Sequence, residues 1–130
     1  MDVPLEFIDI NVRGSQILIN ASSNVDSLEQ IIFISSRSAV GEVPDANSSM
    51  REENAFRPIN PYGASKAAGE GLISAYCEGF GFQACIFRFV SILGERYTHG
   101  HVFDFYQKLK ADPGLLQVLG NGKQRKSYFK

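Results

Sequence analysis

A tyrosine and a lysine, Tyr62 and Lys66, stand four residues apart at the expected start of a helix. Residues at this spacing share one face of a helix. Asn60 and Pro61 precede them; asparagine commonly caps a helix N-terminus and proline suits its first turn. An ammonium held close to a phenol stabilises the phenolate. Tyr62 is therefore a candidate general base, which would take a proton from an alcohol while a hydride leaves the same carbon.

This chemistry also uses a hydroxyl group that orients the substrate, and a hydroxyl-rich segment, residues 33–36, lies upstream. Tyr106 and Lys110 repeat the spacing, but no capped helix start and no serine-ended strand precede them. We interpret that second pair as part of a solvated helix. For the first pair, the alternative is an exposed tyrosine beside a surface lysine.

Alternating helices and strands are expected to position these side chains. Apolar spacing and short apolar runs predict a helix at 5–22, a strand at 31–35, a loop at 37–59, a helix at 61–79, a strand at 83–89 and a helix at 102–110. Short strands are expected at 115–119 and 127–129, around a turn at 120–122. Strand, helix and strand in this order predict a parallel, right-handed βαβ unit.

Composition narrows the class of protein. The 130 residues suffice for one domain or part of one, and 44% hydrophobic with 21% charged residues is typical of a packed core. A net charge of −1 gives no electrostatic basis for binding nucleic acid or an anionic membrane. Without a basic leader or an apolar run of about 20 residues, we expect a cytoplasmic protein.

The cysteines and histidines do not indicate a metal site. Cys77 and Cys85 are expected to be small buried hydrophobes rather than a disulfide or a ligand pair. His99 and His101 have no further ligands at a suitable spacing.

Five segments in order resemble the extended short-chain dehydrogenase/reductase family, in its NAD-dependent epimerase/dehydratase branch typified by UDP-glucose 4-epimerase. They are residues 11–21, 33–41, 60–70, 87–96 and 119–125. The resemblance implies an α/β fold, the C-terminal part of a Rossmann-like doubly wound parallel sheet. Residues 1–114 would form a partial catalytic core, and residues 115–130 the start of a substrate-binding segment.

The resemblance also implies roles for particular residues and ligands. The catalytic residues would be Tyr62, Lys66, Ser36 and Asn11, with Asn11 supporting the lysine. Tyr62, Lys66 and Val90 would contact NAD, or NADP, and Ser36, Ser91 and Arg125 would contact the substrate. That substrate would be a nucleotide-sugar. A homo-oligomer is expected for a separate reason: without the first strands, one apolar edge of the sheet is left unpaired, and such an edge tends to recruit another chain.

Two departures from the family pattern refine this expectation. None of the 12 glycines forms the family's Gly-x-x-Gly-x-x-Gly turn, so we expect an internal piece of a longer protein that lacks the N-terminal dinucleotide-binding strands and is inactive alone. Arg37 and Ser38 stand where sugar 4,6-dehydratases carry an Asp-Glu pair, which favours an epimerase. The alternatives are a related reductase or dehydrogenase with another substrate, and a non-catalytic remnant.

Overall fold

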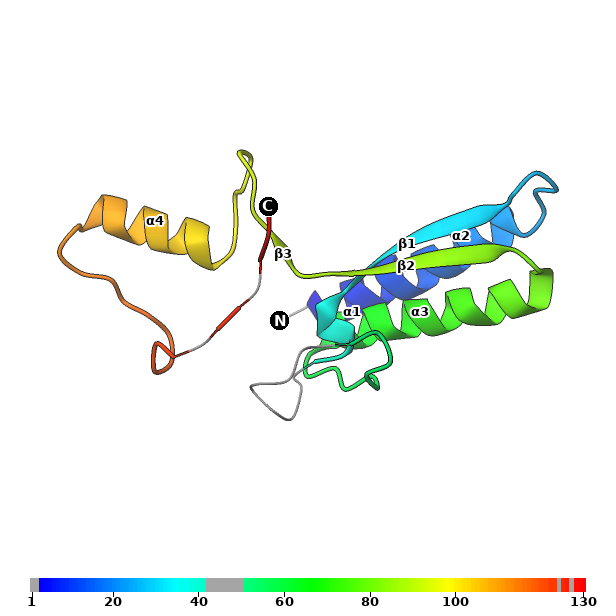
Figure 1. The fold of residues 1–130 in the computed structure, drawn as a ribbon, viewed down its shortest axis with the longest axis horizontal. Coiled ribbons are helices and arrows are strands. Elements are labelled where there is room, and N and C mark those ends of the chain that lie inside the picture. Colours follow the sequence, from blue (N-terminus) through cyan, green and yellow to red (C-terminus); the bar gives the residue numbers. More distant parts are fainter. Residues whose placement is uncertain (1–2, 42–50, 124, 127) are drawn as a thin grey trace. The chain divides into compact units, whose positions relative to one another are not determined.

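The computed structural model describes residues 3–41, 51–123, 125–126 and 128–130 (Figure 1). They fall into two units, Met1–Phe89 and Val90–Lys130. The first unit contains most of the candidate site residues. The expected functional boundary near residue 114 stays a prediction.

A two-stranded parallel sheet and its crossover helix form the framework of the first unit. Strand β1 (Gln30–Ser36) pairs with strand β2 (Gln83–Phe89), in register from Gln30 opposite Gln83 to Ser36 opposite Phe89. Helix α3 (Pro61–Phe80) connects the two strands (Figure 1). The predicted parallel βαβ arrangement is therefore confirmed.

The N-terminal helix differs from the regular one that the sequence predicts. It consists of α1 (Val3–Phe7), a π-helical segment η1 (Ile8–Gly14) and α2 (Ser15–Ser22). The Ser15 hydroxyl donates to the backbone carbonyl of Asn11 at 2.7 Å, near the end of the π segment. Such segments are frequent at functional sites, and they carry no simple sequence signature.

The core of the first unit lies between its helices and one face of the sheet. Ile19 of α2, Ile73 of α3 and Phe82 are its buried centre. Alternate strand residues pack against this centre: Ile31, Phe33, Ala84 and Ile86. Helices α2 and α3 therefore cover the same face of the sheet (Figure 1).

The opposite face of the sheet carries apolar side chains that the described residues leave uncovered. Ile32, Ile34 and Phe87 are 61%, 51% and 42% exposed. Parallel sheets are normally covered on both faces. This surface, the outer sheet face, is the largest departure of the first unit from an ordinary α/β core.

Local sequence signals set both ends of α3. The Asn60 side-chain oxygen accepts a hydrogen bond from the Gly63 N–H at 2.8 Å, and Pro61 occupies the first turn. Gly81, at φ 75°, ends the helix in the left-handed conformation that glycine adopts without strain. The predicted helix is thus confirmed, with its last residue at Phe80 rather than 79.

The second unit contains strand β3 (Ser91–Ile92), helix α4 (His101–Ala111) and strand β4 (Tyr128–Phe129). Strands β3 and β4 pair in parallel. The predicted strand at 115–119 is wrong: these residues form no strand, and Leu119 is 94% exposed. An apolar run needs a partner strand, and no described strand pairs with this one.

Among the described residues, none of the helices combines the length and the apolar character that crossing a bilayer requires.

Candidate active site

Tyr62 lies in the first turn of α3, and its ring is held by the N-terminal helix. The ring is half-buried and packs edge-on against Phe7, with centroids 5.5 Å apart and planes at 64°. Edge-to-face packing of this kind restricts both rings. Phe7 was not predicted as a site residue, and its one signal in the sequence is its place in an amphipathic helix.

Lys66 lies one helical turn further on and points to the end of β1. Its ammonium donates to the carbonyl of Ile34 at 3.1 Å and lies 6.0 Å from the centroid of the Tyr62 ring. It also lies 5.4 Å from the centroid of the Phe33 ring. Partial burial lowers the pKa of the Lys66 ammonium from its ordinary value. The predicted pair is thus on one helix face, with the positive charge beside the aromatic ring.

Ser36 is the last residue of β1 and caps the short 3₁₀ helix η2 (Arg37–Ala39). Its hydroxyl oxygen accepts a hydrogen bond from the Ser38 N–H at 3.2 Å. The next turn of backbone presses against α3: a Cβ placed on Gly63 would lie 2.2 Å from the Ser38 carbonyl oxygen. Residues 36–41 are called the Ser36 turn. Because Gly63 directly follows Tyr62, the Ser36 turn is in close contact with the start of α3.

Asn11 reaches the site through an intermediate that the sequence analysis did not single out. Its side-chain amide donates to the Ser65 hydroxyl at 3.0 Å, and Ser65 donates to the Tyr62 carbonyl at 2.8 Å. Ser65 is fully buried. The π-helical segment is therefore tied to the backbone of Tyr62. The expected support of Lys66 by Asn11 stays a prediction.

A buried acid lies one turn beyond Lys66. Glu70 is 3% exposed and accepts hydrogen bonds from Ser35, which is equally buried, and from the guanidinium of Arg88. The pairing of Glu70 with Arg88 was not predicted from the sequence. The available signal was Arg88, the one charged residue of the strand β2, since charges are seldom buried without a partner.

Three predicted residues belong to the second unit. Val90 and Ser91 lie at its start, and Arg125 is exposed near its end. Their expected contacts with NAD and with a substrate stay predictions.

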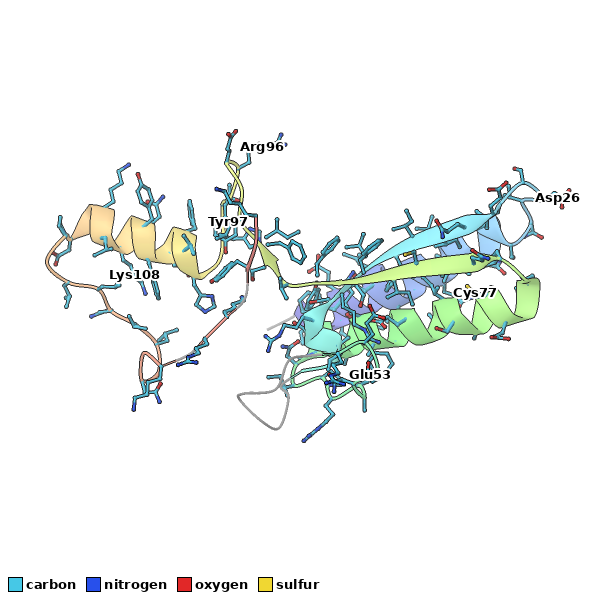
Figure 2. All side chains as sticks on the ribbon, viewed as in Figure 1. Asp26, Glu53, Cys77, Arg96, Tyr97 and Lys108 are labelled. Atoms are coloured by element: carbon cyan, nitrogen blue, oxygen red, sulfur yellow. The ribbon has the colours of Figure 1, made fainter. Side chains whose placement is uncertain are left out.

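Tyr62, Lys66 and Ser36 lie at the carboxyl end of β1 and the N-terminus of α3. In Figure 2, Glu53 marks this end of the first unit, whereas Asp26 and Cys77 mark the opposite end. Ligands of open parallel sheets bind beyond the carboxyl ends of the strands. The arrangement supplies a phenol, an ammonium and a hydroxyl there, which suits proton transfer to or from an alcohol. Within the described ranges, no three His, Cys, Asp or Glu side chains form a group that could hold a metal ion.

Comparison with known proteins places relatives beside this chain. The model of the NAD dependent epimerase/dehydratase family matches residues 1–129. The chain is 28% identical to an uncharacterized UDP-glucose epimerase of Bacillus subtilis over 118 residues, covering 91% of this chain and 36% of that protein. It is also 28% identical to a dTDP-D-glucose 4,6-dehydratase of Mus musculus, covering 95% of this chain and 34% of that protein.

Among solved structures, the UDP-glucuronic acid 4-epimerase of Bacillus cereus, in complex with UDP-glucuronic acid and NAD, superposes with a TM-score of 0.81 at 25% identity. The superposition covers 93% of this chain and 37% of the other. The chain therefore spans little more than a third of the length of these relatives.

Proposed function

The chain belongs to the NAD-dependent epimerase/dehydratase family, and from this premise we propose that it carries the proton-transfer residues of a nucleotide-sugar epimerase. The observation that carries the proposal is the placement of Tyr62 and Lys66 on one face of α3, with the Ser36 turn packed against the start of that helix. NAD is the cofactor of the family. The donor at the nicotinamide ribose would be the Lys66 ammonium.

The described residues fit one end of NAD only. The Lys66 ammonium at the carboxyl end of β1 is a suitable donor to a ribose hydroxyl. The glycine turn that holds the pyrophosphate in Rossmann folds is absent from the sequence. We therefore propose that these 130 residues alone do not convert a substrate. The active protein would include a further segment that holds the pyrophosphate.

The proposed reaction moves one proton and one hydride away from the sugar and back. When bound, NAD accepts and returns the hydride. Tyr62 takes the proton of a sugar hydroxyl as the carbon–hydrogen bond of the same carbon breaks, leaving a ketone. The Lys66 ammonium stabilises the phenolate before that step, and Ser36 hydrogen-bonds the reacting oxygen. Return of the hydride to the other face of the carbon, and of the proton from Tyr62 to the oxygen, gives the epimer.

The choice of epimerase over dehydratase rests on the residues that follow Ser36. Elimination of water needs a further acid and base beside the sugar. Arg37 and Ser38 follow Ser36 here, and neither suits these roles at neutral pH.

The test uses the longest natural protein that contains this chain, supplied with UDP-sugars and NAD, with the epimer measured by chromatography. Tyr62→Phe removes only the phenol oxygen and should reduce kcat more than about tenfold, equivalent to roughly 1.4 kcal/mol. Tyr106→Phe is the matched control, because it alters the second Tyr-x-x-x-Lys pair, on α4. Turnover by Tyr62→Phe above about a tenth of the parent rate would exclude the general-base role. Reduction of a different substrate with no epimer formed would favour the reductase alternative.

A further inference from the structure

Arg88 of β2 holds two groups at once, and they belong to different parts of the first unit. Its Nε and Nη2 atoms donate to both carboxylate oxygens of Glu70 at 2.9 to 3.1 Å. Its Nη1 atom donates to the backbone carbonyl of Glu52 at 2.8 Å, and its Cζ atom lies 5.0 Å from the centroid of the Phe56 ring. One planar guanidinium thus joins a buried acid on α3 to the segment 51–59, which precedes α3.

The buried side of this network ends beside a proposed catalytic residue. Ser35 donates to Glu70 and is the neighbour of Ser36 in β1. Ser35 is also the residue opposite Arg88 in the parallel register. The end of β1 is therefore fixed from within the core, through a side chain one turn along α3 from Lys66.

The loop side of the network supports the same turn from outside. A Cβ placed on Gly41 would lie 2.1 Å from the Arg57 carbonyl oxygen, so the segment 51–59 lies directly against the end of the Ser36 turn. Gly63 of α3 lies against the same turn, at the Ser38 carbonyl. The turn is therefore in close contact both with α3 and with a segment that Arg88 contacts.

We propose that Arg88 is a positioning residue that holds the Ser36 turn through the segment 51–59, an inference that rests on the proposed function for its link to catalysis. Arginine is required rather than any cation, because its rigid fork directs donors to two sides. A lysine ammonium has all its donors at one point. It pairs with Glu70 and leaves the Glu52 carbonyl and the Phe56 ring without their partner.

Two substitutions separate this role from a purely structural ion pair. Arg88→Met leaves the Glu70 carboxylate buried without its cation, and should lower both global stability and local protection. Compared with Arg88→Met, Arg88→Lys should restore the global stability measured by urea unfolding. It should not restore the local protection of the segment 51–59 and the Ser36 turn. Local protection is measured by amide hydrogen exchange at Val40 and Gly41, whose N–H groups bond to the Arg37 carbonyl, and at Asn54, bonded to Arg51.

For Arg88→Lys we expect exchange at these three amides to rise by roughly tenfold while the amides of α3 stay unchanged. Arg51→Lys is the matched control: Arg51 lies in the same segment, and the one interaction described for its side chain is an exposed ion pair with Glu53 at 3.7 Å, so exchange should not change. The proposal would be overturned if Arg88→Lys restored both global stability and local protection. It would also be overturned if Arg88→Lys restored neither. An equal rise in the Arg51→Lys control would do so too.

Exchange is measured on the 130-residue chain without ligand, so its outcome does not depend on turnover. In the longer protein used for the epimerase test, Arg88→Lys should then lower kcat at unchanged stability. Absence of turnover in the unsubstituted protein would count against the proposed function and leave the exchange result standing.

Discussion

The contact between the start of α3 and the Ser36 turn predicts opposite effects for one substitution at two positions of the same helix. At Gly63, an added Cβ would lie 2.2 Å from the Ser38 carbonyl oxygen and 2.9 Å from the carbonyl carbon, both backbone atoms. At Gly71, which is exposed on α3, it would meet nothing within 4 Å. Gly63→Ala must therefore move backbone, whereas Gly71→Ala changes only the helix itself.

The expected magnitudes follow from helix propensity and from packing. Alanine is favoured over glycine inside a helix by about 1 kcal/mol, so Gly71→Ala should stabilise the chain by roughly that amount. Overpacking against atoms that cannot rotate away costs about 1 to 3 kcal/mol. For Gly63→Ala this cost outweighs the propensity gain, and we expect a net loss of up to about 2 kcal/mol. The two variants should then differ by about 1 to 3 kcal/mol.

Urea unfolding of both variants, followed by circular dichroism at low protein concentration, measures this difference. The dependence of the unfolding free energy on urea should be the same for both, since neither changes the surface exposed on unfolding. Equal midpoints for Gly63→Ala and Gly71→Ala would refute the close contact between the Ser36 turn and α3. In the longer protein, Gly63→Ala should also lose turnover, because the phenol of Tyr62 and the hydroxyl of Ser36 would move apart.

Three further predictions concern charge, ligand and surface. Burial lowers the pKa of Lys66, so the folded chain releases this proton at lower pH than the unfolded chain; the free energy of unfolding should rise as the pH approaches 10.5, and Lys66→Met should lack that rise in urea titrations. Arg125→Lys should raise KM for a nucleotide-sugar far more than for NAD, because a lysine does not grip a diphosphate bidentately; equal effects on both would argue against the assignment. The outer sheet face should drive self-association of the 130-residue chain, measured by light scattering, and Ile34→Asp should reduce it. If the unsubstituted 130-residue chain were a monodisperse monomer, this expectation would be contradicted; if it also bound NAD with micromolar affinity, so would the proposed need for a further segment.

Signals that lie close together in the sequence predicted most of the first unit. Asn60 and Pro61 mark the start of α3, and the described structure shows the expected side-chain cap on the Gly63 N–H. Strand β2 has the predicted bounds, Gln83–Phe89. The four-residue spacing of Tyr62 and Lys66 translated directly into a shared helix face.

The features that escaped prediction depend on contacts between residues that are distant in sequence. Arg88 and Glu70 are 18 positions apart, and which charged residue meets which depends on the register of β2 against β1 and on the rotation of α3. The edge-on contact of Phe7 with Tyr62 has the same origin, across 55 positions. The apolar residues 115–119 led to a false strand, because apolarity alone does not supply a hydrogen-bonding partner.

A single helix, α3, carries four of these residues: Tyr62, Ser65, Lys66 and Glu70. The angles between their side chains therefore depend on the number of residues that separate them along the helix. Removing one codon between Tyr62 and Lys66 would turn everything beyond it by about 100° and carry the ammonium away from the phenol. Removing one codon from the segment 51–59 would change no angle among these four groups. Length differences between this chain and its relatives should therefore gather before Asn60 and avoid residues 62–70, and an alignment that opens a gap in that helix is misplaced.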